Sequence, residues 1–392
     1  MNYRFTEQNP GGNDFLVHWV GTRNLLIDGD SPYSDETAVR IQTMAYGRPA
    51  RPGEHELRVA YPLYSGILFT PFALIGDYTL ARALWMTLLE TALIGMAFFC
   101  LRMMNWKIHS WMLVVYLIFA LLWYHAVRPL INGNAVILVA LFIAGALEAI
   151  RHGRDEIAGV LLAFSTIKPQ VVVLIIPFIL FWAITSKRWK ILIWLLIALV
   201  VLTVSAMIFV VDWPLQNLVE VLRYPGYNPP GTPGAAFTTW WPILGSRLGW
   251  GLTIVLGIVL CIEWYLARGK DYRWFLWTAC LTLAISQWIG IQTDPGNFIV
   301  LFTPLVLILA TWEERWGIKR GRPVVVASIL ILFFGIWALF LATIEYGDQA
   351  QQDPIMFFPL PFFILLGLYW VRWWAIKPAK TLIEALRASE DL

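Results

Sequence analysis

One carboxylate of this chain stands where it could take part in chemistry. Asp14 follows two glycines in the polar stretch "GGNDFLVHWVGTRNLLIDGDSPY", residues 11–33. A carboxylate that is positioned and partly shielded from water can act as a general base. The alternative is an acid that is merely solvated in a loop. The glycines permit a close approach of the backbone, so Asp14 is the candidate catalytic residue.

Two basic residues near apolar segments could hold an anionic group. Lys168 lies in "IKPQ" (167–170), and Arg128 lies in "HAVRPLINGN" (125–134). A charge between apolar helices is costly and usually functional, and such cations can stabilise the charge on a departing phosphate. The alternative for Lys168 is snorkelling toward lipid headgroups, and a structural role is equally open for Arg128. Gln170 favours a built turn at Lys168 and joins the candidate binding residues.

Three further side chains are candidates for binding substrate. Asn132 and Asn134 carry amides, which suit the hydroxyl groups of a sugar, although capping of the helix that follows is equally open. His18 lies one turn after Asp14 and could orient that acid or bind substrate; a structural histidine is the alternative. The histidines of the chain show no paired spacing of metal ligands. No phosphate-binding glycine loop occurs, so we expect no metal, no cofactor and no nucleotide-sugar donor.

Composition identifies the environment in which these residues must be positioned. The chain has 392 residues, of which 59% are hydrophobic and 14% are charged. A soluble domain carries about a quarter charged residues, so lipid must cover part of this surface. The apolar runs are about 16 to 22 residues long, near the length of a membrane-spanning helix. They occupy residues 80–101, 110–127, 135–150, 191–211, 251–266, 274–291, 298–312, 323–344 and 357–374.

Two segments depart from this pattern. Residues 62–76 contain two prolines in a short apolar run, which indicates an interfacial or half-inserted helix. Residues 157–185 are too long for one span and are interrupted at Lys168, so we predict two short helices that form a hairpin there. The fold class is therefore an all-α polytopic membrane protein, with a single domain over residues 1–392.

The basic residues between the apolar runs predict the orientation. They concentrate in the links 102–109, 151–156, 186–190, 267–273 and 315–322, which the positive-inside rule places in the cytoplasm. About eleven spans follow from this alternation. We expect an external loop at 1–61, a transmembrane bundle at 62–374 and a cytoplasmic tail at 375–392. The outer links are longer, and binding or chemistry is expected on that face.

The longest of the outer links after the first loop covers residues 212–249. It is rich in proline and glycine, which we expect to prevent regular structure. Its tyrosines and tryptophans could stack on sugars, but an aromatic belt at the membrane interface is at least as favoured.

Several stretches together resemble a known family. The segment from Asp14 to Tyr33, "YPLYSGILFTPFALI" from Tyr61, "INGNAVILVALFIAG" (131–145) and "AGVLLAFSTIKPQVVVLIIPF" (158–178) are similar to family-87 glycosyltransferases. These are polyprenol-phosphate-mannose-dependent mannosyltransferase-like proteins of the GT-C superfamily. The likeness extends over most of the chain; its first-loop pattern is moderately specific and the rest is diffuse.

The resemblance implies a multi-pass enzyme of the cell membrane with its active site on the extracytoplasmic face. Such an enzyme transfers a mannose-like hexose from a polyprenyl-phosphate carrier to a glycan or glycolipid acceptor. The transfer inverts the configuration of the anomeric carbon. The acid of the first outer loop acts as the base, a role that falls on Asp14, and Tyr33 and Tyr61 fall among the substrate-binding residues. The expected partners are the lipid-linked sugar donor, the acceptor and the bilayer, with no nucleic acid.

Two departures from the family pattern leave alternatives open. The family normally has a membrane helix before the first-loop acid, so we expect an apolar helix encoded upstream of Met1. Many relatives carry a Ser-Pro…His motif in a late outer loop, where this chain has "GIQTDPGNF" (290–298), with Asp294 and Asn297 but no histidine. A transporter or flippase of lipid-linked sugars, or an inactive homologue that binds prenyl phosphate, are the alternatives to the enzyme.

Overall fold

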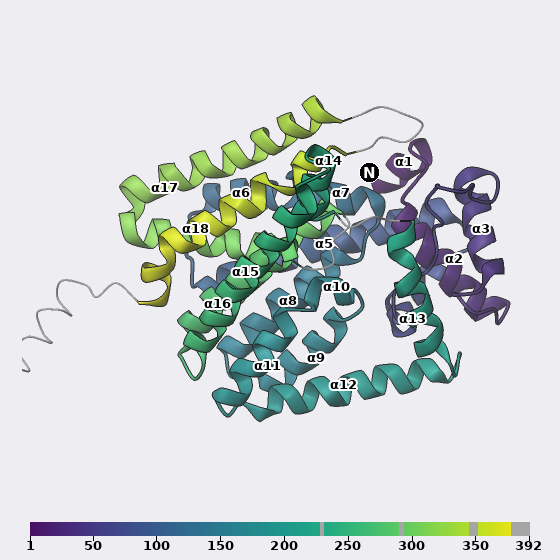
Figure 1. Cartoon of the computed structure of the whole chain (residues 1–392), viewed down its shortest axis with the longest axis horizontal. Helices are drawn as coiled ribbons and strands as arrows, with labels where there is room; N and C mark the ends of the chain where they lie inside the picture. Colours follow the sequence, from purple (N-terminus) through teal and green to yellow (C-terminus); the bar gives the residue numbers. More distant parts are fainter. Residues whose placement is uncertain (228–230, 290–293, 345–351, 378–392) are drawn as a thin grey trace, which may run out of the picture.

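The computed structural model describes residues 1–227, 231–289, 294–344 and 352–377, and helices form all the regular structure of these residues (Figure 1). The first segment, which we expected to form an external loop with a helix after Asp14, folds into several short helices. Three α-helices come first, and a 3-10 turn then leads into a fourth α-helix. They are α1 (Asn2–Gln8), α2 (Asn13–Ile27), α3 (Asp35–Tyr46), η1 (Leu63–Ser65) and α4 (Gly66–Ala73).

The next part of the chain forms the body of the bundle. A long apolar helix is followed by a bent pair, a buried helix, and a broken segment that leads into another long helix. These elements are α5 (Tyr78–Met104), α6 (Ser110–Leu122), α7 (Tyr124–Asn132), α8 (Val136–Arg151), α9 (Asp155–Ser165), α10 (Pro169–Val172), α11 (Ile175–Thr185) and α12 (Trp189–Met207). The break at Lys168 in residues 157–185 is confirmed, with three helical pieces where we predicted two.

The proline-rich link 212–249 is more regular than expected. Its described residues contain α13 (Trp213–Arg223), the 3-10 turn η2 (Tyr224–Gly226) and α14 (Pro233–Trp240). Pro214 and Pro233 stand in the first turns of these helices. The missing N–H of proline costs nothing there, and its fixed φ suits the helix, so these prolines start helices and do not prevent them.

The C-terminal part completes the bundle with long helices. They are α15 (Gly245–Ala267), α16 (Tyr272–Ile289), the 3-10 helix η3 (Pro295–Leu301), α17 (Phe302–Thr343), η4 (Pro354–Phe357) and α18 (Pro359–Ile376). α17 is not one straight rod, because Gly317 has φ 70° and ψ 174°. Figure 1 shows that α17 turns back on itself, and Gly317 lies within the basic link that we predicted at 315–322.

The chain is a helical membrane protein, but the expected number of about eleven spans is not reached. By length and composition, five helices of the described residues could cross a membrane, or up to six if the bent pair α6 and α7 is one span. α8 has 16 residues and α11 has 11. A straight crossing needs about 20 residues, so several apolar runs that looked like spans form shorter helices within the bundle.

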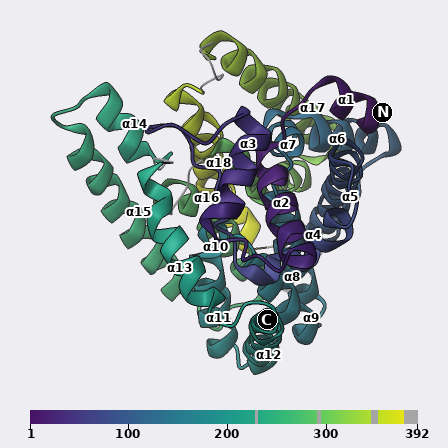
Figure 2. The ribbon, with the colours of Figure 1, turned by 90° about the vertical axis from the view of Figure 1, so that its right-hand side faces the viewer.

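The two ends of the bundle differ in their elements. The turns from α11 to α12, from α15 to α16 and within α17 lie in the left-hand half of Figure 1, and α2 and α3 lie at its right-hand end. Figure 2, which looks at that end, shows α2 and α3 in front of the other helices. Three of the predicted basic links therefore gather toward one end, and the helices of the first segment cover the other.

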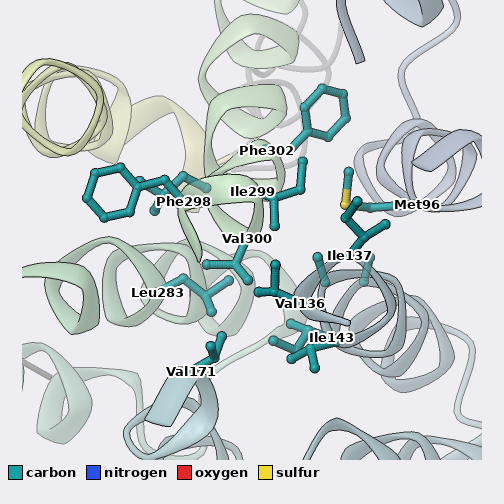
Figure 3. Packing of buried hydrophobic residues seen from close by; sticks show 14 of the residues in the cluster. Met96, Val136, Ile137, Ile143, Val171, Leu283, Phe298, Ile299, Val300 and Phe302 are labelled. Carbon is teal, nitrogen blue, oxygen red and sulfur yellow. The ribbon is translucent and has the colours of Figure 1, made fainter. Parts of the chain in front are cut away.

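A continuous apolar core fixes α8, α10 and η3 against each other. Figure 3 shows Val300 of η3 beside Val136 of α8, with Val171 of α10 on the same cluster. Each of these side chains is at most 2% exposed. Asn297, Asn134 and Lys168 lie two or three residues before them along the chain, so this packing also positions three polar side chains.

Candidate active site

Two glycines and a buried arginine set the start of α2. Gly12 caps the helix with φ 79°, in the left-handed region that favours glycine. A Cβ at this position would overlap the side chain of Arg82. The Arg82 guanidinium donates to Asn9 O (2.7 Å) and to Ile131 O (3.0 Å). Arg82 thereby ties the turn before Asp14 to the end of α7.

The apolar stripe after Asp14 predicts a helix that lies on the membrane through Phe15 and Trp19, but in the structure both side chains are buried inside the protein. Phe15 is fully buried, and its ring packs 5.5 Å from the Trp85 ring and 5.9 Å from the Tyr78 ring. Trp19 Nε1 donates to Phe72 O (3.0 Å). The face that we assigned to the bilayer therefore packs on α4 and α5, because these helices supply an aromatic surface that a sequence stripe cannot distinguish from lipid.

Asp14 accepts hydrogen bonds from two amides of the next structural layer. Asn134 Nδ2 donates to Asp14 Oδ2 (2.8 Å), and Asn132 Nδ2 donates to the same oxygen. Asp14 is half-buried, in the first turn of α2, where the helix dipole favours a negative charge. The geometry leaves Asp14 Oδ1 as the oxygen through which this carboxylate could take a proton.

The sharp turn between α7 and α8 brings the two amides to one side. Gly133 ends α7 with φ 72° and ψ 28°. Its carbonyl accepts from Trp85 Nε1 (2.8 Å), and a Cβ at Gly133 would collide with Phe15. Glycine is therefore required twice, by its left-handed backbone and by the close approach of α2.

Lys168 meets the same network from the opposite side. Its ammonium donates to Asn134 Oδ1 (2.9 Å) and to Asn297 Oδ1 (2.7 Å), and Lys168 is 4% exposed. The Tyr61 ring centroid lies 5.9 Å from Nζ. Asn134 therefore joins a carboxylate to an ammonium, with its Nδ2 bonded to Asp14 and its Oδ1 bonded to Lys168.

Burial shifts the ionisation of this acid and this base in opposite directions. It raises the pKa of the Asp14 carboxyl above its ordinary value of 3.8, and the nearby Lys168 ammonium opposes that rise. Burial lowers the pKa of Lys168 from 10.5 to about 8, against the attraction of Asp14 and Asp294. Both shifts follow from the cost of holding a charge away from water.

Arg128 lies beside this network in an ion pair. Its Nε and Nη2 donate to both oxygens of Asp294, at 2.7–3.1 Å. Asp294 Oδ1 also accepts from Gly296 N (2.5 Å), so this side chain caps the start of η3. Burial alone would raise the pKa of the Asp294 carboxyl. The charge and hydrogen bonds of Arg128 outweigh this effect and hold that pKa below its ordinary value. Both side chains remain about one-third exposed, so the pair is open to an incoming anion.

The other predicted residues lie around this centre, and the Tyr61 hydroxyl donates to Asn134 Oδ1 (3.4 Å). His18 packs between the rings of Tyr61 (4.1 Å between centroids) and Phe69 (4.6 Å). Burial, and to a lesser extent Lys168, lowers the pKa of His18 to about 3, so its ring is neutral. The Tyr33 hydroxyl donates to Tyr61 O (2.8 Å) and thereby supports the Tyr61 backbone. Gln170 is half-buried in α10, two residues beyond Lys168.

Three residues of this neighbourhood were not among the predicted site residues. Asn297, fully buried, anchors Lys168, and Asp294 engages Arg128. Both stand in the segment that departs from the family motif, so that departure was their sequence signal. Arg82 is 2% exposed and lies inside an apolar run. A charge within such a run is itself a signal of function or structure.

The described residues contain no group of three or more His, Cys, Asp or Glu side chains that could hold a metal ion. The expectation of a metal-free site stays a prediction. Asp14, Asn132, Asn134 and Lys168 meet in one network, and Arg128 and Asp294 lie beside it.

Comparison with known proteins identifies the family. The model of glycosyltransferase family 87 matches residues 60–286, more than half of the chain. The matched range includes Arg128, Asn134 and Lys168, whereas Asp14 and Asp294 lie outside it. Searches of curated proteins and of solved structures gave no match. A helical membrane protein whose central part fits this family model is a glycosyltransferase, and the chain belongs to glycosyltransferase family 87.

Proposed function

We propose that the chain is an inverting glycosyltransferase that moves a hexose, mannose-like in type, from a polyprenyl-phosphate carrier to a hydroxyl of a glycan or glycolipid. The observation that carries this proposal is the Asp14–Asn134–Lys168 network. It places a carboxylate and a buried ammonium on the two ends of one amide. Such a pair suits a reaction in which one group loses a proton while another gains negative charge.

Asp14 is the proposed general base. The acceptor oxygen attacks the anomeric carbon as its proton passes to Asp14 Oδ1, while the bond from that carbon to the phosphate oxygen breaks. The electron pair of this bond leaves with the polyprenyl phosphate. Attack opposite to the leaving group inverts the anomeric centre. The bonds of Asn132 and Asn134 to Oδ2 fix the carboxylate, which supports a directed role for the other oxygen.

Lys168 and Arg128 are the proposed cations for the donor phosphate. Lys168 has three N–H donors, and two of them go to Asn134 and Asn297. The third is available for an anion. Arg128 is held by Asp294, so a phosphate that binds Arg128 must share or displace that carboxylate. This competition favours a ligand of higher charge than a single carboxylate, as a phosphate is.

The amides and rings retain distinct proposed roles. Asn132 is half-buried and could meet a sugar hydroxyl, whereas both polar atoms of Asn134 already bond protein groups. We therefore propose that Asn134 positions Asp14 and Lys168. His18, Tyr33, Tyr61 and Gln170 are proposed as the wall of the substrate site, with the active centre on the extracytoplasmic face of the cell membrane.

The test is transfer of labelled mannose from a polyprenyl-phosphate donor by the purified full-length chain in lipid. Asp14→Asn keeps the shape of the side chain but removes the base, so we expect kcat to fall by about 10²–10⁴-fold. Donor binding is expected to stay within about twofold of wild type, because phosphate contacts are proposed for Lys168 and Arg128.

Asp28→Asn is the matched control, since Asp28 ends the same helix and pairs with exposed Arg40. It is expected to retain activity. Equal activity of the Asp14 variant and wild type would remove Asp14 from the mechanism. Donor binding by wild type without any transfer would instead assign the chain to the inactive, prenyl-phosphate-binding alternative.

A further inference from the structure

A polar hollow lies far from the proposed active site, at the other end of α8. Asn134 stands just before α8, and Arg151 is its last residue. The helix has 16 residues and therefore spans about 24 Å. The hollow is open to the surface and has a volume of about 470 Å³ between the links α8–α9, α11–α12 and α15–α16. A separation of this size approaches the thickness of the hydrocarbon core, and we therefore take the hollow to lie near the membrane surface opposite to the proposed active site.

Hydrogen bonds between the three links make this hollow a built feature. Trp182 Nε1 donates to Lys270 O (3.1 Å), and Gly269 N donates to Thr185 Oγ1 (3.2 Å). Arg188 donates to Ile150 O (2.8 Å) and pairs with Asp155. Side chains from distant parts of the sequence are thereby held around one space.

The wall of the hollow has a strong excess of positive charge. Its only acid among the described lining residues is Asp271, which caps Trp274 N. Of its four cations, only Arg188 pairs with a carboxylate in the described part of the chain. The cations are Arg151, Lys187, Arg188 and Lys270.

Neutral donors and rings complete a surface that suits a phosphate at the membrane boundary. The Ser186 hydroxyl oxygen is buried in the wall and has no hydrogen-bond partner among the described residues. Trp182 and Tyr272 line the same space. Such amphipathic rings favour the headgroup level of a bilayer, and an unused hydroxyl beside several cations is a donor for an anionic oxygen.

We propose that this hollow binds a phosphate ester, with the headgroup of an anionic phospholipid as its source. The positive-inside rule explains why cations occur in these links. It does not require that cations of three links converge on one space, where three of the four have no carboxylate partner among the residues that the structure describes. Basic pockets between membrane helices are suited to anionic headgroups.

The test counts lipids bound to the full-length, detergent-solubilised chain by native mass spectrometry, with phosphatidylglycerol as probe and phosphatidylcholine as the net-neutral comparison. Lys187→Ala with Lys270→Ala is expected to weaken phosphatidylglycerol binding about tenfold. Lys190→Ala with Arg268→Ala is the matched control. It removes the same charge from the same two links, but neither residue lines the hollow.

The control pair is expected to bind phosphatidylglycerol within twofold of wild type. Equal losses in the two double variants would overturn the proposal, because the effect would then be that of net charge alone. Glycerol 1-phosphate, added as competitor, distinguishes the sources. If glycerol 1-phosphate displaces phosphatidylglycerol when both are present at the same concentration, the site binds soluble phosphate esters. If the lipid stays bound, the site is specific for the phospholipid. Mannose transfer is expected to be unchanged in both double variants, which separates this test from that of the active site.

Discussion

Burial brings the pKa values of Asp14 and Lys168 closer together. The pKa of Asp14 is raised, and that of Lys168 is lowered to about 8. The base must be deprotonated to accept a proton, and the cation must be protonated to hold phosphate. We therefore expect kcat/KM to rise with pH as Asp14 ionises and to fall again near pH 8 as Lys168 loses its charge. Rates of mannose transfer across this range measure both limbs.

Lys168→Arg tests which group sets the alkaline limb. The guanidinium stays protonated throughout the accessible range, so the fall near pH 8 should disappear while the acid limb keeps its position. An unchanged alkaline limb in this variant would show that another group titrates there.

Asn134 offers a second test at the residue scale. Asn134→Asp keeps an oxygen for Lys168 but cannot donate to Asp14, and it places a like charge beside that acid. The added negative charge and the lost hydrogen bond should raise the pKa of Asp14 further, so the acid limb of kcat/KM should move to higher pH. Asn297→Asp is the control, because Asn297 also bonds Lys168 and the Asn134 donor to Asp14 remains. A shift of equal size in both variants would contradict direct positioning by Asn134.

At the scale of elements, the α7–α8 turn decides where Asp14 meets its amides. Gly133→Ala introduces a Cβ at φ 72° and against Phe15. Positive φ and overpacking together should cost about 2–4 kcal/mol and should displace the first turn of α2. We expect a lower Tm and a loss of transfer activity.

Gly153→Ala is the matched control for that turn. Gly153 has φ 69°, but a Cβ there meets open space. It should therefore lower stability by about 1–2 kcal/mol from backbone strain alone and leave transfer nearly unchanged. Thermal unfolding and the transfer assay, applied to both variants, separate strain from the contact with Phe15. Equal effects would refute the importance of the α2 contact.

The whole molecule presents its first segment at one end and three basic links toward the other (Figure 1). We predict that the end with α2 and α3 faces outward. Arg51→Cys should react with a membrane-impermeant maleimide on intact cells, and Lys319→Cys only after permeabilisation. Cys261→Ser provides the background, because Cys261 is exposed, whereas Cys100 and Cys280 are buried. The reverse labelling pattern would place the active site on the cytoplasmic face.

The sequence by itself determined the membrane class, the family and several local features. Apolar runs of spanning length require lipid, whatever the arrangement of the helices. The break at Lys168 follows from a charge and a proline inside an apolar run, and it is present between α9 and α10. Asn132 and Asn134 were recognisable because polar amides directly precede an apolar run.

Only the tertiary structure decided how these residues combine and how many helices are long enough to span. Whether Phe15 faces lipid or Trp85 depends on a neighbour 70 residues away, and both environments are apolar. The bond of Lys168 to Asn297 joins residues 129 positions apart, and the pairing of Arg128 with Asp294 joins residues 166 apart. Hydrophobic periodicity describes one helix at a time, whereas these contacts arise from the packing of α8, α10 and η3 around a shared core.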